Sequence, residues 1–156
     1  MKIGVFPGSF DPFTLGHLEV AKKGLELFDE LILLVTVNPA KTGFLPLEVR
    51  MQSLQGLLNR VRVESHSGLL VDYMRQHQLQ HVLRGIRNQQ DLEFEFQMEA
   101  MNKGLYTQIQ YVYVNTGDDL RSVSSGWIRQ IHNLGGDVSA WVPTKIMDVI
   151  RRNKNG

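Results

Sequence analysis

The sequence predicts an α/β fold: a single-domain, doubly wound (Rossmann-like), parallel five-stranded sheet with helices on both faces. Three observations lead to this prediction. Short β-branched runs alternate with helix-length amphipathic segments, which is the order of β-α-β units. Several of the short strands are apolar on both sides, as in a parallel sheet covered by helices. The 156 residues, 42% of them hydrophobic, suit one compact domain spanning residues 1–156.

Five apolar or β-branched runs are the predicted strands, and the longest of them is the second. They are Ile3–Phe6, Leu31–Val37, Arg60–Glu64, His81–Leu83 and Gln110–Val114. The amphipathic segments between and after them are the predicted helices. They are His17–Phe28, Leu47–Leu58, Leu69–His77, Asp91–Leu105, Ser124–Asn133 and Thr144–Arg152. Ligands of such folds lie beyond the carboxyl ends of the strands, which directs attention to residues 7–17, 38–43, 84–91 and 115–126.

The fourth predicted helix contains a segment, Leu92–Glu99, that alternates apolar and polar residues as a strand would. Its Glu, Gln, Met and Ala residues favour a helix, which is our prediction. At about 100° per residue the apolar side chains form two stripes on nearly opposite sides. One stripe is Leu92, Phe96 and Ala100, and the other is Phe94, Met98, Met101 and Leu105. Because one core needs one apolar face, we expect the other face to meet a partner subunit.

Composition and charge exclude several classes of protein. The net charge of +1 argues against a protein that coats nucleic acid. The absence of cysteine rules out a disulfide scaffold, a thiolate zinc site and a cysteine nucleophile. The longest apolar run is far shorter than the roughly 20 residues of a membrane span, and the N-terminus lacks the features of a signal peptide. We therefore expect a cytoplasmic protein with neither nucleic acid nor a membrane as partner.

The stretch Pro7–His17 carries the clearest chemical signal, because it follows the first predicted strand and opens the first helix. Gly8 allows close approach of the backbone to a ligand, Ser9 offers a hydroxyl, and the helix start presents free N–H groups. His17 can donate its Nε2–H to a phosphoryl oxygen without acting as a base. The pattern therefore indicates a phosphate site, with an Asp-Pro turn and a helix-capping histidine as the alternative. The P-loop, the dinucleotide fingerprint, the His-Glu-x-x-His metal motif and the nucleophile elbow are absent from the sequence.

Three segments together resemble a known family. Gly8-Ser9-Phe10-Asp11-Pro12-x-Thr14-x-Gly16-His17 is similar to the first signature of the nucleotidylyltransferase superfamily, and Val123–Arg129 resembles the second. Between them, Arg84–Glu95 resembles a segment of the phosphopantetheine adenylyltransferases, and this segment selects the family. Further matches are Lys41, Leu47-Glu48-x-Arg50, Gly68-Leu69-Leu70 and Gly136-Asp137-Val138. The resemblance covers almost the whole chain.

The resemblance implies transfer of the adenylyl group of ATP to 4′-phosphopantetheine, which yields dephospho-coenzyme A and pyrophosphate in the penultimate step of coenzyme A biosynthesis. It also implies Mg²⁺, held mainly through phosphates rather than by protein ligands, a homohexamer, and coenzyme A as a candidate feedback inhibitor. Two alternatives stay open. One is another member of the superfamily with a different acceptor, such as nicotinamide mononucleotide. The other is a non-catalytic nucleotide-binding module.

The resemblance also implies roles for individual residues. His17 is matched with the transition-state stabiliser, and Lys41 and Arg84 with catalytic residues that, together with Ser9 and Leu70, bind phosphopantetheine. The positions matched with ATP contacts are Ser9, Phe10, His17, Gly85, Ile86, Arg87, Glu95, Leu120, Arg121, Ser122, Val123, Ser124, Ser125 and Gly126. By themselves, Lys41 would read as a solvated loop charge and Glu95 as a charge on a helix surface. Gly126 departs from the family pattern, because it replaces the third serine of a Ser-Ser-Ser run.

Overall fold

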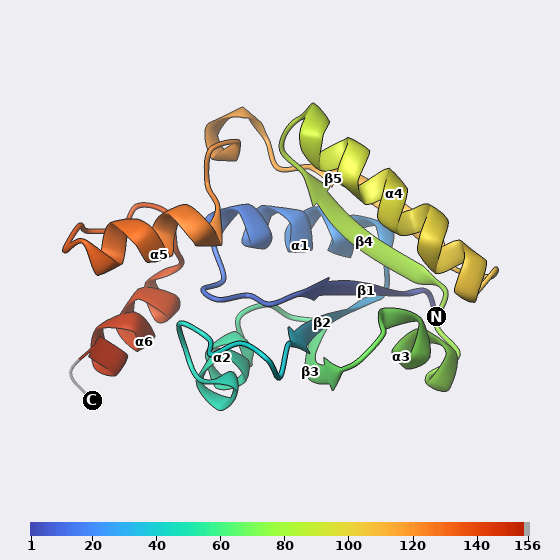
Figure 1. Cartoon of the computed structure of the whole chain (residues 1–156), viewed down its shortest axis with the longest axis horizontal. Helices are drawn as coiled ribbons and strands as arrows, with labels where there is room; N and C mark the ends of the chain where they lie inside the picture. The colour runs from blue at the N-terminus through green and yellow to red at the C-terminus, as the bar shows by residue number, and fades with distance from the viewer. Residues whose placement is uncertain (155–156) are drawn as a thin grey trace.

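A computed structural model describes residues 1–154 and arranges them as a sheet with helices on both sides (Figure 1). The strands are β1 (Ile3–Gly8), β2 (Glu30–Val37), β3 (Val61–Ser67), β4 (His81–Ile86) and β5 (Gln110–Asn115). The helices are α1 (Leu15–Leu27), α2 (Leu47–Leu54), α3 (Leu70–Gln76), α4 (Gln89–Leu105), α5 (Ser125–Asn133) and α6 (Thr144–Lys154), with a short 3₁₀ helix η1 (Asp118–Leu120). All strand pairs are parallel, in the order β3-β2-β1-β4-β5. The predicted fold class is therefore confirmed.

The sheet separates two apolar cores. The larger core joins side chains of β1, β2 and β4 to α1, α2, α5 and α6. The smaller core lies on the opposite face, where Val5, Ile32 and Val82 pack against Val71 and Met74 of α3. Side chains along a strand alternate between the two faces, so β1, β2 and β4 contribute to both cores. Burial on both faces explains why β1 and β2 are mostly apolar.

Helix α1 lies unusually close to β4. A Cβ atom placed on Gly24 would lie 2.4 Å from Leu83 Cδ2, and one placed on Gly85 would lie 2.5 Å from Val20 Cγ2. Either position would therefore force a neighbouring side chain to move if a larger residue replaced glycine. These two glycines allow α1 to pack closely along β4, which matters for the site described below.

Two element boundaries illustrate how the structure differs from the sequence-based prediction. The second helix ends at Leu54 rather than Leu58, because Gly56 adopts a left-handed φ of 72° just beyond the C-cap residue Gln55. Strand β4 continues to Ile86 instead of ending at Leu83, since it pairs with β5 along its full length. Arg84 and Gly85 therefore lie within a strand and not in the loop after it.

Helix α4 confirms the prediction of a helix over Leu92–Glu99, and it is exposed to an unusual degree. Glu95 is its buried residue, whereas large apolar side chains of both predicted stripes are exposed. These are Phe94 (60%), Phe96 (47%), Met98 (37%), Met101 (68%) and Leu105 (55%). Figure 1 shows the helix running beside β4 and β5 at one end of the molecule. Among residues 1–154, α4 and the other helices lack the combination of length and apolar character that a membrane span requires.

Two glycine-to-alanine substitutions should have opposite effects on stability, because only one of the glycines lies in the close contact of α1 with β4. Gly24→Ala should lower the free energy of unfolding by about 1–3 kcal/mol, because the new methyl group overlaps Leu83. Gly104→Ala in α4 is the matched control, since no atom lies within 4 Å of the position of its Cβ. Alanine there should raise stability by about 0.5–1 kcal/mol through helix propensity. Urea unfolding of both variants measures the difference, and equal midpoints would contradict the packing argument.

Candidate active site

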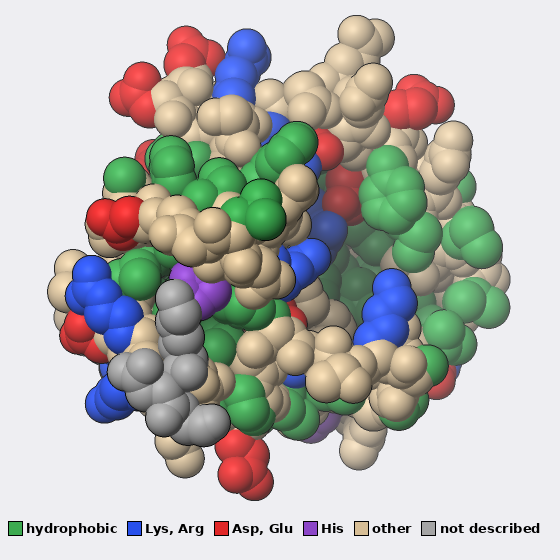
Figure 2. Space-filling model, turned by 60° about the vertical axis from the view of Figure 1, so that its left-hand side comes forward, with side chains coloured by type: hydrophobic (Ala, Val, Ile, Leu, Met, Phe, Trp, Pro, Cys, Tyr) green, Lys and Arg blue, Asp and Glu red, His purple; other side chains and the backbone are tan. Residues whose placement is uncertain are grey.

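A cleft of about 310 Å³ opens at the carboxyl ends of β1 and β4. The strand order reverses between these two neighbours, so the cleft lies where ligands of doubly wound folds bind. Figure 2 shows a hollow on this side of the molecule in which basic and acidic side chains meet. The predicted site residues that line the cleft are Ser9, Phe10, His17, Arg84, Gly85, Arg87, Glu95, Val123, Ser124 and Ser125.

The loop after β1 forms one wall of the cleft and is tightly packed. Phe10 is buried and has a positive φ of 47°, a conformation that non-glycine residues rarely adopt. Its ring lies so close to Gly8 that a Cβ atom on Gly8 would be 2.9 Å from Phe10 Cε1. The strained turn places Ser9 in the wall of the cleft and Phe10 against the ring of His17.

The local structure at the start of α1 fixes the protonation of His17. Thr14 is the N-cap residue, and its side-chain oxygen accepts a hydrogen bond from the His17 amide. In return, the Thr14 amide donates to His17 Nδ1 at 3.0 Å, so Nδ1 carries no proton. In a neutral imidazole the proton is then on Nε2, which makes Nε2 a hydrogen-bond donor. The predicted role of His17 as an Nε2–H donor is consistent with this capping geometry.

The surroundings of His17 keep the imidazole neutral. Its ring centroid lies 5.1 Å from that of Phe10, 5.3 Å from that of Phe13 and 6.1 Å from that of Phe6. Burial among these rings, followed by the positive charges of Arg84 and Arg87, lowers the pKa of His17 to about 3. At neutral pH His17 is therefore an uncharged donor and not a general acid or base.

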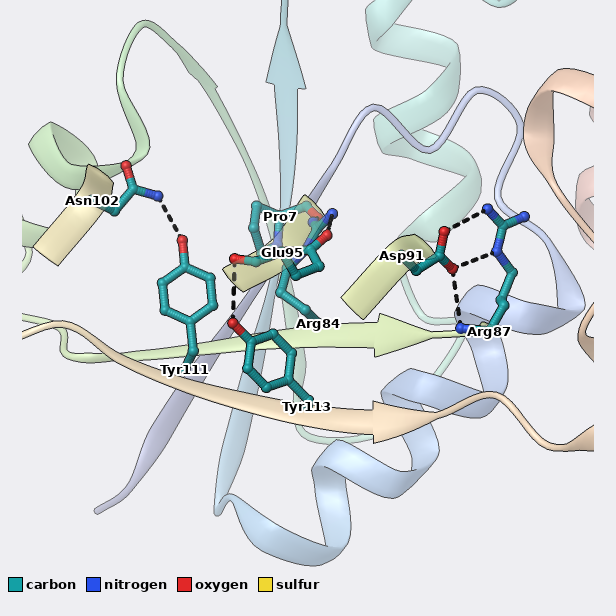
Figure 3. A network of polar contacts seen from close by, with 8 residues as sticks. All are labelled: Pro7, Arg84, Arg87, Asp91, Glu95, Asn102, Tyr111 and Tyr113. Atoms are coloured by element: carbon teal, nitrogen blue, oxygen red, sulfur yellow. Dashed lines mark hydrogen bonds and ion pairs between the residues drawn. The ribbon is translucent and has the colours of Figure 1, made fainter. Parts of the chain in front are cut away.

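Arg84 projects from β4 into the cleft and is oriented by Glu95 of α4 (Figure 3). Arg84 Nε donates to both Glu95 carboxylate oxygens at 3.0 Å, Nη2 donates to Oε1 at 2.7 Å, and Nη1 donates to the carbonyl of Pro7 at 2.6 Å. A guanidinium has five N–H donors, and this arrangement uses three of them. Two donors remain for an anion, while the planar group is held in one orientation.

Arg87 is paired in a similar way with Asp91, in the first turn of α4. Arg87 Nε and the Arg87 amide both donate to Asp91 Oδ2 at 3.0 Å. Burial raises the pKa of the Asp91 carboxyl, but the hydrogen bonds and charge of Arg87 outweigh this effect and lower it. Arg87 Nη1 also reaches the carbonyl of Val123 at 3.3 Å, which links the two sides of the cleft. Both acidic side chains in the lining, Asp91 and Glu95, are therefore already paired with arginines.

The N-terminus of α5 closes the remaining side. Ser124 is its N-cap residue, and its hydroxyl oxygen accepts from the Trp127 amide at 3.1 Å. The Ser125 hydroxyl donates to the carbonyl of Pro12 at 2.7 Å. Both serine hydroxyls thus have partners within the protein. The first-turn amides have no acceptor inside the helix, and they carry the positive end of the helix dipole.

A second cavity of about 410 Å³ adjoins the cleft and shares Arg87 and Thr116 with it. Two further predicted residues, Ile86 and Arg121, line this cavity. Thr116 is buried, and its hydroxyl has no hydrogen-bond partner among residues 1–154. Neither Thr116 nor Asp91 is among the site residues predicted from the sequence. For Asp91 a signal existed, because it follows Arg87 at the spacing of an i,i+4 pair.

Five predicted residues lie outside both cavities. They are Lys41, Leu70, Leu120, Ser122 and Gly126. Lys41 is exposed in the loop between β2 and α2, and Leu70 is half-buried at the first position of α3. The interpretation of Glu95 as a helix-surface charge is wrong, because this carboxylate is only 6% exposed.

The comparisons with known proteins agree on one family. A family model described as cytidylyltransferase-like matches residues 5–131. The phosphopantetheine adenylyltransferase of Thermotoga neapolitana is 40% identical over 147 residues, which cover 92% of this chain and 91% of that protein. The protein of the same name from Syntrophus aciditrophicus is 43% identical over 145 residues, with coverages of 91% and 88%.

The solved structures agree with the fold. A Vibrio parahaemolyticus protein, provisionally named a nicotinate-nucleotide adenylyltransferase, matches with a TM-score of 0.74 at 18% identity, covering 97% of this chain and 99% of that one. At that identity the likeness concerns the fold alone. The sequence relatives and the family model together decide the family: the chain belongs to the phosphopantetheine adenylyltransferases.

Proposed function

We propose that the protein transfers the adenylyl group of ATP to 4′-phosphopantetheine and releases dephospho-coenzyme A and pyrophosphate. The observation that carries the proposal is the neutral Nε2–H donor of His17 in a cleft with Arg84, Arg87 and the α5 N-terminus. The family of the chain adds the identity of the two substrates. The acceptor phosphate supplies its own nucleophilic oxygen, so the protein needs no nucleophile.

The proposed mechanism is in-line attack of the acceptor phosphate on the α-phosphate of ATP. A P–O bond forms to the attacking oxygen, and the bond to the bridging oxygen of pyrophosphate breaks. Charge accumulates on the non-bridging oxygens of the α-phosphate, where His17 Nε2–H can donate a hydrogen bond. The remaining donors of Arg84 would orient the acceptor phosphate, and the α5 amides would hold the triphosphate. Orientation of two anions is thus the main contribution of the protein.

Magnesium would accompany the nucleotide rather than occupy a site of its own. Residues 1–154 contain no cluster of three or more His, Asp or Glu side chains that could hold a metal ion. Asp91 and Glu95 already pair with Arg87 and Arg84. Mg²⁺ commonly keeps several water ligands and binds through phosphate oxygens, and it would neutralise phosphate charge in this way.

An assay of pyrophosphate release with ATP tests the proposal directly. We expect release to depend on 4′-phosphopantetheine and to be small with nicotinamide mononucleotide, glycerol 3-phosphate or choline phosphate. Equal activity with one of these acceptors would redirect the function within the superfamily. ATP binding without turnover of any acceptor would instead indicate a nucleotide-binding module. Coenzyme A added to the same assay shows whether it inhibits.

We also propose that the protein assembles as a homohexamer, with α4 at or near subunit contacts. The exposed apolar residues of α4 support assembly, because monomeric proteins rarely expose apolar side chains so close together. The hexameric state itself comes from the family resemblance. Sedimentation at micromolar concentration measures it, and a stable 17.8 kDa monomer would contradict the proposal.

His17 should remain neutral, protonated on Nε2, from pH 8 down to about pH 4, because its pKa lies near 3. Nitrogen NMR of labelled histidine measures both the tautomer and the pKa. The unfolded chain takes up this proton near pH 6.5, so the contribution of His17 to stability falls as pH decreases from about 6.5 to about 3.

His17→Ala should lower kcat by about 10²–10³-fold and change the KM values much less, because the donor acts on developing charge. A titration of His17 between pH 6 and 8, or near-normal kcat in the alanine variant, would contradict its role.

Arg84→Lys should weaken binding of phosphopantetheine by about tenfold or more and that of ATP less. Lysine keeps the charge but cannot bond Glu95 in the planar, two-point geometry of Arg84. Glu95→Gln is the partner variant, since it keeps Arg84 but loosens its orientation. Calorimetry with each ligand gives the ratio. Equal losses for both ligands in Arg84→Lys would reject the assignment of Arg84 to the acceptor.

The α5 site should depend on backbone amides and not on serine hydroxyls. Ser125→Pro removes one N–H at the first helical position, where proline is well tolerated, and Ser125→Ala is its matched control. The proline variant should bind ATP about tenfold more weakly than the alanine variant. Gly126→Ser should bind ATP normally or slightly better, since its φ is not left-handed and the atoms nearest its Cβ position are 3.8 Å away. Equal ATP affinity of the two Ser125 variants would disprove recognition through the backbone.

A further inference from the structure

Asp11 is a buried carboxylate that lies behind the cleft and does not line it. It is 7% exposed, and its two oxygens accept hydrogen bonds from the amides of Phe44 and Leu45 at 2.7 and 2.8 Å. These amides are more than 30 residues away in sequence, in the segment that follows Lys41. Asp11 therefore joins the loop after β1 to the loop after β2.

Arg50 of α2 completes this connection from the other side. It is 8% exposed, its Nε donates to the carbonyl of Leu45 at 3.0 Å, and its Nη1 donates to the carbonyl of Ser9 at 2.8 Å. Its Nε also lies 3.9 Å from Asp11 Oδ1, so the two buried charges compensate each other. We call these groups the Asp11 anchor: the Asp11 carboxylate, the Phe44 and Leu45 amides, and the Arg50 guanidinium.

The Asp11 anchor also reaches the third side of the cleft. Arg129 of α5 donates to the backbone carbonyl of Asp11 at 2.8 Å, and Ser125 donates to the next carbonyl, that of Pro12. The loop with Ser9, the segment after Lys41 and the N-terminal part of α5 therefore meet at one buried point. Gly43 fits between them, because a Cβ atom there would lie 2.9 Å from the Leu45 carbonyl and 3.0 Å from Asp11 Oδ2.

The backbone on both sides of Lys41 is held by hydrogen bonds. Before it, the Lys41 amide donates to the Asn38 carbonyl at 3.1 Å, and the Ala40 amide donates to Asn38 Oδ1 at 3.0 Å. After it, the chain is attached at Phe44, three residues on, through the Asp11 anchor. The side chain of Lys41 is exposed, so it depends on its backbone for a defined position.

We propose that Asp11 is a positioning residue for Lys41. By holding the Phe44 and Leu45 amides, Asp11 places Lys41 toward the acceptor phosphate. The proposal rests on the proposed function and on the role that the family resemblance implies for Lys41, binding of the phosphate of phosphopantetheine. It also accounts for Arg50 in the Leu47-Glu48-x-Arg50 segment, since this arginine neutralises Asp11 and holds Leu45 and Ser9.

Asp11→Asn is the first test variant. An amide has one acceptor oxygen, so its NH₂ group must face one of the two backbone N–H groups and release that contact. We expect the KM for phosphopantetheine to rise about tenfold, while the Kd for ATP changes less than about threefold. Asp72→Asn is the matched control, because Asp72 is exposed on α3 and should leave both constants unchanged.

A double-mutant cycle with Lys41→Ala separates positioning from general damage. If Asp11 acts through Lys41, Asp11→Asn should raise the acceptor KM by less than about twofold in the Lys41→Ala background. Independent effects of the two substitutions, or equal losses for ATP and acceptor, would overturn the proposal. A normal acceptor KM in Lys41→Ala would also overturn it.

Gly43→Ala provides the same test with every charge retained, in case Asp11→Asn does not fold. Its methyl group would push the segment off Asp11, so it should reproduce the selective rise in acceptor KM and the coupling to Lys41→Ala. Gly104→Ala serves as its control. Turnover of phosphopantetheine by the unaltered protein tests the proposed function separately. An active enzyme without the coupling therefore rejects only the inference about Asp11.

Discussion

The reversal of strand order between β1 and β4 is the constraint on which the site depends. β1 leads into α1 on one face of the sheet, and β4 leads into α4, which contacts α3 on the other face. The two following segments therefore diverge and leave a cleft between them. His17 enters this cleft from α1 and Glu95 from α4. The close packing of α1 on β4, which glycine makes possible at Gly24 and Gly85, sets how near these groups come to each other.

In the cleft, the orientation of the charged groups matters more than a large net positive charge. Arg84 and Arg87 each pair with a carboxylate of α4, so the four charges nearly cancel before a ligand binds. The attraction for phosphate then comes from donors that keep their direction: the free guanidinium N–H groups, the first-turn amides of α5 and His17 Nε2–H. Such donors need little rearrangement when charge develops. The low pKa of His17 fits this arrangement, because burial among aromatic rings, and then the two nearby arginines, disfavour a charged imidazole.

Features with a local cause were predictable from the sequence, and features that depend on long-range contacts were less so. The order of strands and helices and the helix-capping start of α1 follow from short patterns. The length of β4 depends on its pairing with β5, which is about 30 residues away. The burial of Glu95 depends on Arg84, a residue of another element. The hydrogen bonds of Asp11 could not be predicted for the same reason, because its partners Phe44 and Leu45 are distant in sequence.

Helix α4 joins the chemistry of the cleft to the surface of the molecule. Its attachment to the sheet is largely polar: Glu95 bonds Arg84, and Asn102 donates to the Tyr111 hydroxyl at 2.6 Å (Figure 3). Phe96 adds one aromatic contact with Tyr113. Glu95 is the residue that α4 buries. The contact that attaches the helix to the sheet is therefore also the contact that orients Arg84. Phe94 and Met98 lie on the flank of that contact, so a subunit packed against them would restrain the helix that orients Arg84. Assembly through α4 would therefore act on the orientation of Arg84 in the cleft from outside the cleft itself.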